Sequence, residues 1–412
     1  MANMAEDPIR VWPNERWTRV PNWAYTDKSV LVREQERIFE GKSWCYVCLE
    51  AEIPNSGDFK RSQLGTKPVI AVRGADGEVN VVVNRCAHRS MQFCSANRGS
   101  VKEFTCPYHQ WTYDLEGKLL GLPFRRGLRG QGGMPEDFKL EENGLQALRV
   151  AVRGGVVFAT FSDATEPFEA FLGPAMLGYF DRVFSGRELE VLGYMRQRIP
   201  SNWKLMVENL KDPYHASLLH VFLITFGLFR LDQRSEVELD ESGRHCVLVS
   251  RRGEQVVNDA TKEMRQFRAD FSLQDKRLLE PVQEFPGDAT VAMQTIWPNI
   301  IVQQQSNTLA MRQIVPVDEG QFDLAWTFFG YKDDPPELRQ RRLRQANLMG
   351  PAGLVSLDDS EALLISQWGV TPNEKSNMLL EMGGRDIKSE PTMLTETALR
   401  GFYRHYCEVM GF

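Results

Sequence analysis

The feature of this sequence that most constrains its fold is a pair of short motifs between Cys86 and His109. The first arm reads C-x-H (Cys86 and His88), and the second reads C-x-x-H (Cys106 and His109), with 17 residues between His88 and Cys106. Each arm therefore supplies one thiol and one imidazole, and both are common metal ligands. The chain must fold so that two loops bring four ligand-type side chains together.

The distribution of ligands between the arms favours a binuclear iron–sulfur cluster over a single metal ion. A structural zinc site usually takes two cysteines from one arm and two histidines from the other. Here the two arms, placed side by side, would put two thiolates on one iron and two imidazoles on the other, which is the Rieske 2Fe–2S ligation. A zinc site and two coincidental Cys/His pairs remain as alternatives. Cys45 and Cys48 form another C-x-x-C pair within a strand pattern, and we interpret them as core thiols.

A second set of ligand-type residues occurs in NWKLMVENLKDPYHASLLH, residues 202–220. It contains His215 and His220, two of only six histidines in the chain. On an ideal helix, residues five apart would point roughly 140° away from each other. Pro213 favours a broken helix here, which would let both rings reach one ion. Two histidines and one carboxylate form the facial triad of non-heme iron(II) oxygenases.

The carboxylate of such a triad must come from another part of the chain. The best candidates are Asp358 and Asp359 in GPAGLVSLDDSEALL, residues 350–364. We expect this pair at a loop-to-helix boundary, where one carboxylate faces the metal and the other caps the helix. The alternatives are a plain N-cap for the aspartates and hydrogen-bonded core positions for the two histidines.

Bulk composition excludes several classes of protein. A chain of 412 residues is expected to form two or three domains, and its net charge of −6 argues against a nucleic-acid-binding protein. The N-terminal residues lack the apolar segment of a secretory signal, and the most apolar run, 218–229, is too short to span a membrane. We therefore expect a cytoplasmic protein without membrane attachment. In that setting, seven cysteines favour thiols and metal ligands over disulfides.

The order of expected elements indicates an α+β protein. Residues 1–40 predict an arm and a helix, 41–160 predict a small antiparallel β domain with both Cys/His motifs in its loops, and 161–412 predict a second domain of mixed elements. Helices and strands do not strictly alternate in the second domain, which argues against a doubly wound sheet. In that domain, helical patterns cover 166–184, 203–230, 335–350, 359–367 and 391–409, and strand patterns cover 246–252, 290–305, 308–316 and 322–331.

Taken together, the two sets of residues resemble those of the large (α) subunits of Rieske non-heme iron aromatic-ring-hydroxylating oxygenases. The first motif matches the family pattern C-x-H-x17-C-x2-H in full. The second is similar to N-x2/3-D-x2-H-x4-H, with Asn209, Asp212, His215 and His220 in place. The similarity covers nearly the whole chain and is greatest to the anthranilate dioxygenase and salicylate 5-hydroxylase group, through RVPNWAYT, QANLMGPAGLVSLDDSE and EMGG. In naphthalene-type enzymes one more residue separates the asparagine from the aspartate.

The resemblance implies a fold and two cofactors. The fold is an antiparallel β Rieske domain followed by a helix-grip (START-like) catalytic domain with a large antiparallel sheet. The cofactors are a Rieske 2Fe–2S cluster and a mononuclear non-heme Fe(II). The implied cluster ligands are Cys86, His88, Cys106 and His109, and the implied iron ligands are His215, His220 and Asp359, the second residue of the aspartate pair.

The resemblance also implies partners and catalytic residues. Asp212 and Asn209 would act in catalysis, with Asp212 linking His109 of one α subunit to His215 of the next. The assembly would be an α3β3 hexamer with a small β subunit. The chain has no GxGxxG motif or other nucleotide fingerprint, so electrons from NAD(P)H must arrive through a separate reductase, often with a ferredoxin.

The expected function is that of a terminal oxygenase component, which uses O2 to hydroxylate an aromatic carboxylate such as anthranilate. The alternatives are 5-hydroxylation of salicylate to gentisate, terephthalate-type dioxygenation and, from a different class, a Rieske electron carrier. Arg312, assisted by Gln305, is the candidate to bind the substrate carboxylate, because a guanidinium can hold a carboxylate bidentately. A structural arginine paired to an acid is the alternative. Apolar pocket candidates, each of which could instead be core, are Phe222, Leu223, Phe226 and Leu228.

Overall fold

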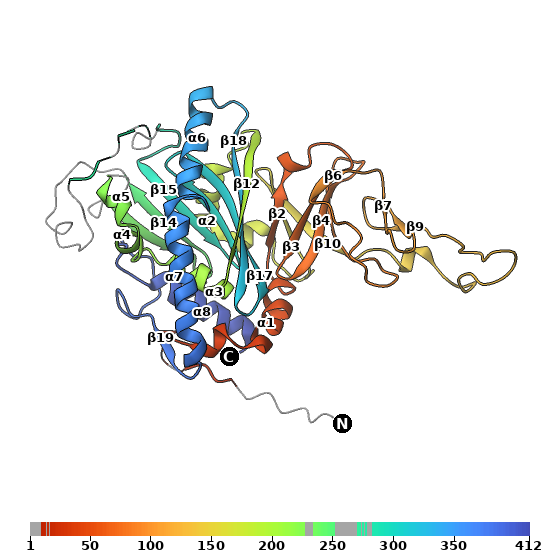
Figure 1. The fold of residues 1–412 in the computed structure, drawn as a ribbon, viewed down its shortest axis with the longest axis horizontal. Helices are drawn as coiled ribbons and strands as arrows, with labels where there is room; N and C mark the ends of the chain where they lie inside the picture. The colour runs from red at the N-terminus through yellow and green to blue at the C-terminus, as the bar shows by residue number, and fades with distance from the viewer. Residues whose placement is uncertain are drawn as a thin grey trace.

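Two large antiparallel sheets lie side by side along the longest axis of the molecule (Figure 1). The computed structural model describes residues 10–13, 15, 17–226, 234–251, 270–272, 274–275, 277 and 282–412. Every strand ladder in these residues is antiparallel, and helices pack on the sheets, so the predicted α+β class is confirmed. Among the described helices, none combines the length and the apolar character needed to cross a bilayer.

The N-terminal sheet has a nearly continuous apolar interior. Its strands β2 and β11 are buried at every position, because both faces of the sheet are covered there. A three-stranded sheet at its outer end carries the second Cys/His arm: β7 (Phe104–Thr105), β8 (Thr112–Tyr113) and β9 (Leu119–Gly121). The order of the seven-stranded sheet is β2 (Cys45–Leu49), β11 (Val156–Thr160), β10 (Ala147–Arg153), β5 (Val79–Val83), β4 (Lys67–Arg73), β3 (Asp58–Leu64) and β6 (Arg98–Ser100).

The second sheet is a meander whose last strand pairs with its first. Six strands follow one another in sequence, and β12 (Leu189–Ile199), which precedes them in the chain, pairs with the final strand β18 (Gln321–Tyr331). The other strands, in order from β18, are β17 (Thr308–Asp318), β16 (Ile300–Gln305), β15 (Ala289–Ile296), β14 (Cys246–Arg251) and β13 (Ser235–Leu239). A further small sheet pairs β1 (Arg19–Pro21) with β19 (Asn377–Leu379).

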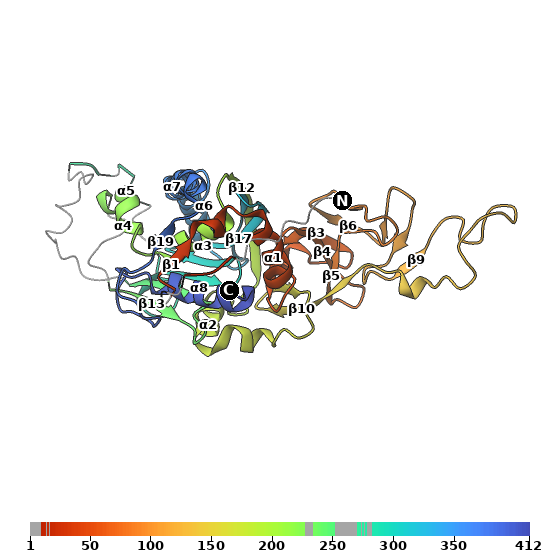
Figure 2. The ribbon, with the colours of Figure 1, turned by 90° about the horizontal axis from the view of Figure 1, so that it is seen from below.

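Helices cover the two faces of the second sheet (Figure 2). On one face, Gln294 of β15 donates to the backbone of α2 (Phe168–Val183). On the other, Gln197 of β12 bonds with Ser356 of α7 (Leu354–Val370). The remaining helices are α1 (Lys28–Glu34), α3 (Trp203–Lys211), α4 (Ala216–Leu219), α5 (Val221–Thr225), α6 (Pro336–Met349) and α8 (Thr397–Met410), with short helical turns η1 (Asn22–Tyr25), η2 (Gln35–Phe39), η3 (Glu50–Glu52), η4 (Leu140–Glu142) and η7 (Thr371–Asn373).

Several predicted helix boundaries differ from the structure. The pattern over 203–230 is divided into α3, α4 and α5, consistent with the break expected at Pro213, and its end at 227–230 lies outside the described residues. The helix predicted at 359–367 begins five residues earlier, at Leu354, with Gly353 as its N-cap. The prediction that Asp358 and Asp359 lie at a loop-to-helix boundary is therefore wrong. The last helix begins at Thr397 rather than 391, and strands β12 and β13 were not predicted.

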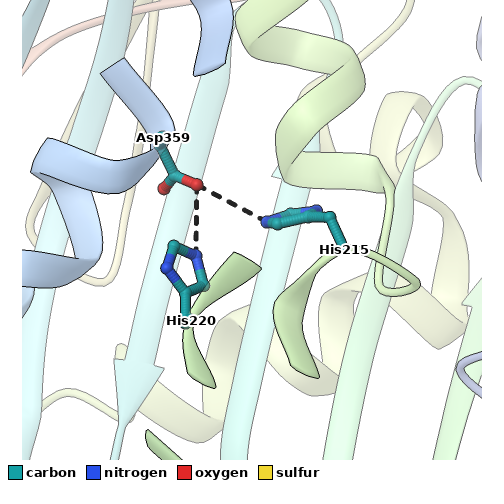
Figure 3. Close-up of side chains that lie close together, drawn as sticks. All are labelled: His215, His220 and Asp359. Atoms are coloured by element: carbon teal, nitrogen blue, oxygen red, sulfur yellow. Dashed lines mark ion pairs between the residues drawn. The ribbon is translucent and has the colours of Figure 1, made fainter. Parts of the chain in front are cut away.

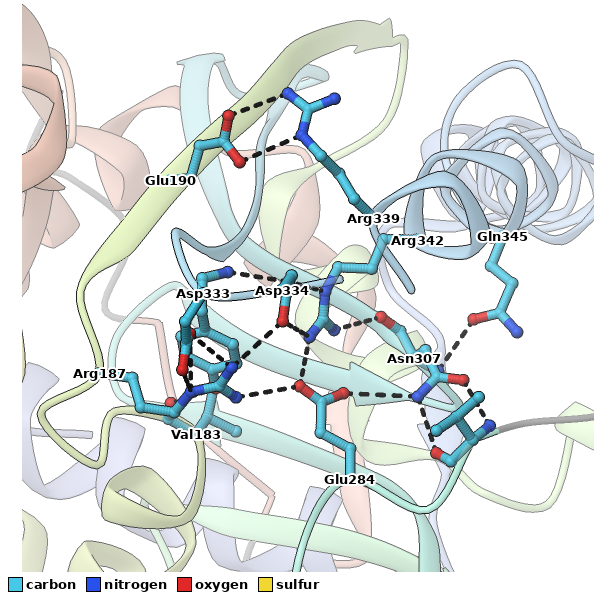
Figure 4. A network of polar contacts seen from close by, with 12 residues as sticks. Val183, Arg187, Glu190, Glu284, Asn307, Asp333, Asp334, Arg339, Arg342 and Gln345 are labelled. Atoms are coloured by element: carbon cyan, nitrogen blue, oxygen red, sulfur yellow. Dashed lines mark hydrogen bonds and ion pairs between the residues drawn. The ribbon is translucent and has the colours of Figure 1, made fainter. Parts of the chain in front are cut away.

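A buried ionic network attaches α6 to the second sheet (Figure 4). The Arg342 side chain, 1% exposed, lies 2.7 Å from Asp334 and also pairs with Glu284. Its Nη1 donates to the backbone carbonyl of Asn307 at 2.7 Å. Two buried carboxylates thus share one guanidinium whose remaining donors are satisfied by the loop between β16 and β17. Buried charges are tolerated only with such partners.

Replacing Arg342 with methionine is expected to lower the free energy of unfolding by about 3 kcal/mol, because the buried Glu284 and Asp334 would keep only the more exposed Arg187, 3.5 and 3.2 Å away, as a counter-charge. Denaturant unfolding followed by fluorescence would measure the change. The matched control is Arg339→Met on the same helix, whose pair with Glu190 is 44% and 37% exposed. That pair is worth less than about 1 kcal/mol. Equal losses in the two variants would contradict a special role for the buried network.

Candidate metal centres

The two Cys/His arms form a pair of loops with the same backbone hydrogen bonds. In the first, Cys86 N–H donates to the carbonyl of Met91 at 2.8 Å, and Ser90 N–H donates back to Cys86 at 3.0 Å. In the second, Cys106 N–H donates to Trp111 at 2.9 Å, and Gln110 N–H donates to Cys106 at 2.8 Å. The residue four after each cysteine, Ser90 or Gln110, has a positive φ of 56° or 55°. The two cysteines therefore occupy equivalent positions.

We call these two loops, residues 86–91 and 106–111, the paired-loop site. Its thiols lie toward the protein interior, and its imidazoles lie toward the surface. Cys86 and Cys106 are 3% and 1% exposed, whereas His88 is exposed and His109 is half-buried. The two imidazole rings lie with their centroids 4.5 Å apart. The site thus presents a sulfur side toward the protein and a nitrogen side toward the surface, which fits the two differently ligated irons of a Rieske cluster.

Aromatic side chains support the ligands of the paired-loop site. The His88 ring stacks on Trp111 at 4.8 Å with an interplanar angle of 2°. The Tyr113 hydroxyl oxygen accepts the N–H of Ala87 at 3.2 Å, which leaves its proton free for the Cys86 sulfur at 3.1 Å. A hydrogen bond to a ligating sulfur stabilises the more negative, reduced cluster and raises its potential.

The second set of residues converges on one point (Figure 3). The ligand atoms of His215, His220 and Asp359 all lie within 4.8 Å of one another. Asp359 Oδ1 is 3.5 Å from Nε2 of His215 and 3.1 Å from Nε2 of His220. His215 precedes α4, and His220 separates α4 from α5 with φ −91° and ψ 54°, so the helix is broken where both rings turn inward. Two neutral imidazoles and one carboxylate fit a divalent iron with open positions.

A further set of side chains orients these three groups. His220 presents Nε2 to Asp359, while its Nδ1 lies 3.2 Å from Asp358 Oδ2. Such a carboxylate–histidine pair fixes the ring and makes the ligating nitrogen more basic. Asn209 Nδ2 donates to Asp359 Oδ1 at 3.1 Å. Asp358 therefore supports the iron ligand His220 and does not cap α7. This role was not predicted, and the only sequence signal for it is that Asp358 is adjacent to Asp359.

Asp212 lies on the far side of His215. Its Oδ2 is 3.4 Å from His215 Nδ1, and that nitrogen is buried with no hydrogen-bond partner in the described part of the chain. Burial would lower the pKa of His215, but Asp212 and Asp359 raise it to about 10. The same imidazoles hold the pKa of Asp359 well below its ordinary value, against the effect of burial. In the absence of a metal ion, a proton on His215 would compensate the two carboxylates, and a metal ion must displace that proton to bind.

Arg312 is a buried cation without an acidic partner among the described residues. It is 4% exposed, Trp326 covers its guanidinium at 4.0 Å, and its Nε has no hydrogen-bond partner in this part of the chain. Burial lowers the pKa of Arg312 to about 10, and the charge of Asp359 opposes this shift. Arg312 lies on the face of the second sheet that carries Gln197 and faces α7, so it shares the side of the iron ligands.

Only some of the other residues predicted to contact the substrate lie near Arg312 or the iron ligands. Gln305 does not reach Arg312; it accepts from Gln303, and Gln303 in turn accepts from Arg312 Nη1 at 3.3 Å. The two-residue alternation of a strand was the signal that could have identified Gln303. The Phe222 ring lies 6.2 Å from His220, whereas Phe226 bonds through its backbone to Phe222. Leu223 is buried, and Leu228 lies outside the described residues.

The cysteines outside the paired-loop site behave as predicted. Cys45 and Cys48 are fully buried in β2 with free thiols. Burial raises the pKa of the Cys45 thiol to about 12, so it is inert at neutral pH. Their interpretation as core thiols is confirmed.

Comparisons with known proteins agree with both sites. The chain matches the family model described as the Rieske 2Fe-2S domain over residues 43–131 and the one described as the ring hydroxylating alpha subunit (catalytic domain) over residues 186–411. It therefore belongs to the family of ring-hydroxylating oxygenase α subunits, which combine a 2Fe–2S cluster with a mononuclear non-heme iron. This membership removes the zinc-protein and electron-carrier alternatives.

Individual relatives align with almost the whole chain. The chain is 52% identical to the large oxygenase component of salicylate 5-hydroxylase from Ralstonia sp., over 97% of this chain and 96% of that protein. It is 44% identical to the anthranilate 1,2-dioxygenase large subunit from Burkholderia cepacia, over 97% and 95%. Among solved structures, naphthalene 1,2-dioxygenase from Rhodococcus sp. superposes with a TM-score of 0.79 at 22% identity, covering 95% of this chain and 94% of that one. That likeness confirms the predicted helix-grip fold.

Replacing Tyr113 with phenylalanine is expected to lower the reduction potential of the cluster by about 60 mV. For a one-electron couple this corresponds to about 1.4 kcal/mol, the size of a hydrogen bond to a charged group. A redox titration followed by visible absorption would measure the shift. Tyr108→Phe is the control, because Tyr108 is exposed, its ring lies 3.8 Å from the His109 ring at an angle of 34°, and its hydroxyl has no hydrogen-bond partner among the described residues. A shift of the same size in Tyr108→Phe would contradict the assignment.

Replacing Asp358 with alanine is expected to weaken iron binding by about 10- to 100-fold, because His220 would lose the partner that fixes its ring. Competition with a chelator, followed by metal analysis, would measure the affinity. Glu361→Ala is the control on the same helix, since that side chain is exposed. The cluster absorption provides an internal reference for folding. An unchanged iron affinity in Asp358→Ala would show that Asp358 has no supporting role.

Proposed function

We propose that this α subunit hydroxylates a benzoate that carries a small polar group ortho to its carboxylate. The single observation that carries the proposal is the buried guanidinium of Arg312, which lies on the iron side of the second sheet and has no acidic partner among the residues that the structure describes. A buried cation is costly unless an anion joins it. The relatives named above act on salicylate and anthranilate. Both acids are benzoates, and they differ only in the group ortho to the carboxylate, which is a hydroxyl in salicylate and an amine in anthranilate.

The contacts of Arg312 leave one edge of its guanidinium for a carboxylate. Trp326 covers one face, and Nη1 is engaged by Gln303 and by the sulfur of Met293 at 3.8 Å. In the described part of the chain Nε has no hydrogen-bond partner, so a substrate carboxylate would approach the Nε and Nη2 edge and form two parallel hydrogen bonds. Gln303 and Gln305 would hold the guanidinium in that orientation. Phe222, beside His220, would contact the ring of the substrate, with Phe226 one turn further along.

When bound, the iron activates O2 and the cluster supplies electrons one at a time. The protein side chains position the reactants and exclude water. His215, His220 and Asp359 would hold the iron, and Cys86, His88, Cys106 and His109 would hold the cluster. Asn209 would restrain the Asp359 carboxylate through its 3.1 Å hydrogen bond. NAD(P)H would act only through a separate reductase, directly or through a ferredoxin.

We propose an α3β3 assembly in which the cluster of one chain serves the iron of the next. In one chain the paired loops near β7 and β9 lie at the opposite end of the long axis from α4 and α5, which flank the iron ligands (Figures 1 and 2). Asp212 would link His109 of one copy to His215 of the next, as its position 3.4 Å from His215 Nδ1 suggests. The relatives are named as large subunits or components, which supports a small β subunit. The free thiols support a cytoplasmic location.

The substrate proposal is tested by turnover of the oxygenase, co-expressed with its small subunit and supplied with a compatible electron-transfer chain. Anthranilate, salicylate, benzoate and terephthalate would be offered separately and the products identified by mass. Catechol from anthranilate would establish dioxygenation, and gentisate from salicylate would establish a single hydroxylation. If none of the four acids were oxidised while the cluster stayed intact and reducible, the substrate class would be wrong.

Replacing Arg312 with glutamine is expected to lower kcat/KM for the preferred acid by about 10- to 100-fold, the cost of losing a charge-assisted bidentate contact. For Arg312→Lys, kcat/KM should lie between the values for the wild-type protein and Arg312→Gln, because an ammonium group keeps the charge but cannot form the two parallel hydrogen bonds of a guanidinium. The control substrate is the neutral amide of the same acid, whose turnover should change little. An equal loss for acid and amide would indicate a structural arginine.

A further inference from the structure

A groove separates the N-terminal sheet from the edge of the second sheet. Its volume is about 790 Å³, and it is lined on one side by β3 with Gln92, Asn97 and Arg98, and on the other by β12, β17 and β18. Strand β12 is the end strand of its sheet. Its Tyr194 hydroxyl reaches across the groove to Glu52 at 2.7 Å. The groove therefore has walls from both halves of the chain.

The groove carries an excess of positive charge. Its lining includes five cations, Lys60, Arg61, Arg98, Arg196 and Arg198, and two acids, Glu52 and Asp323. Both acids are already paired: Lys60 lies 2.9 Å from Glu52, and Arg198 lies 2.8 Å from Asp323. The other three arginines have no acidic partner among the residues that the structure describes. Because the whole chain has a net charge of −6, this surplus is local.

Two of these three guanidinium groups are held toward the groove by neutral neighbours. Arg61 donates to the Asn97 side chain at 2.7 Å, and Arg98 lies 5.8 Å from the ring of Tyr194. Arg196 is exposed on β12. Each of these guanidinium groups can form two parallel hydrogen bonds with one carboxylate. The groove thus fits an acidic surface better than a neutral one.

The groove also adjoins the paired-loop site. Gln92 in its wall follows Met91, whose carbonyl accepts the Cys86 N–H at 2.8 Å and whose sulfur lies 4.0 Å from the Cys106 sulfur. Asn97 and Arg98, on the same wall, continue the same segment of chain. A protein seated in the groove would therefore contact the loop that holds the sulfur side of the cluster.

We propose that this groove is the docking surface for an acidic electron-donor protein that reduces the cluster. The inference rests on the proposed function and adds the surface on which its electron donor would dock. The donor is oxidised by one electron and the cluster is reduced by one electron, with no bond formed or broken. Complementary charge would steer the donor into the groove and raise the rate of association, with little effect on the reaction at the iron.

The test uses the complete oxygenase, its small subunit and its own donor protein, with Arg98→Glu, Arg196→Glu and the double variant. Stopped-flow absorbance would give the second-order rate constant for reduction of the cluster by the donor. Each reversal is expected to lower it about tenfold at low ionic strength, with the difference shrinking as salt is added. The control is Arg344→Glu, an exposed arginine on α6 outside the groove, which should leave the rate constant unchanged.

Reduction by dithionite, which needs no docking surface, should be equal in all variants and would show that the cluster is intact. An unchanged donor rate in the double variant would overturn the proposal. Loss of the small subunit from the variants, seen by native mass spectrometry, would also overturn it, because the groove would then be covered within the assembly. If wild-type protein reduced by dithionite oxidised no aromatic acid, the proposed function would fail independently of the docking surface.

Discussion

The convergence of His215, His220 and Asp359 dictates how the catalytic half of the chain is built. Their ligand atoms lie within 4.8 Å, an arrangement of lone pairs that a bound cation stabilises. A continuous helix would turn the two rings roughly 140° apart. Accordingly, α3 ends at Lys211, α4 has only four residues, and His220 leaves the helical conformation. Asp359 lies instead within the unbroken α7, so one ligand is carried by a rigid helix and two by turns.

A broken segment keeps its shape only if its flanks are fixed, and α3 provides that fixed point. Its Lys204 is 2.7 Å from Glu34, and both side chains are fully buried. Its Glu208 accepts hydrogen bonds from Tyr25 at 2.5 Å and from Tyr403, and burial raises the pKa of Glu208 to about 7. These contacts attach α3 to the N-terminal arm and to α8. The turn that carries both histidines therefore begins from a helix anchored at two distant parts of the chain.

The Cys/His arms and the His215/His220 pair could be proposed from the sequence because their spacing is local, whereas Asp359 was chosen over Asp358 only through the resemblance to a family. C-x-H and C-x-x-H need only two loops, and a proline between α3 and His215 is visible in the sequence. The surroundings of Arg312 could not be predicted in the same way, because they depend on strand register. Arg312 of β17 pairs with Trp326 on the neighbouring strand β18, and Gln303 lies on the other neighbouring strand, β16. The start of α7 was misplaced because its N-cap is Gly353, which has no side chain to accept a capping hydrogen bond and so gives only a weak signal in the sequence.

If Arg312 binds the substrate carboxylate as proposed, its position explains how one iron site could give different products. The guanidinium belongs to the sheet, whereas the iron ligands come from α7 and from the turns on either side of α4, so a carboxylate bound at Arg312, as proposed, and the iron would be fixed by separate layers. With the carboxylate turned toward the iron, the carbon that bears it and its neighbour would be exposed to attack. With the ring turned so that the carboxylate points away, the carbon para to the ortho substituent would be exposed instead. Because Trp326 and Gln303 restrict the approach to Arg312, side chains on the sheet would choose between these orientations without any change of iron ligand.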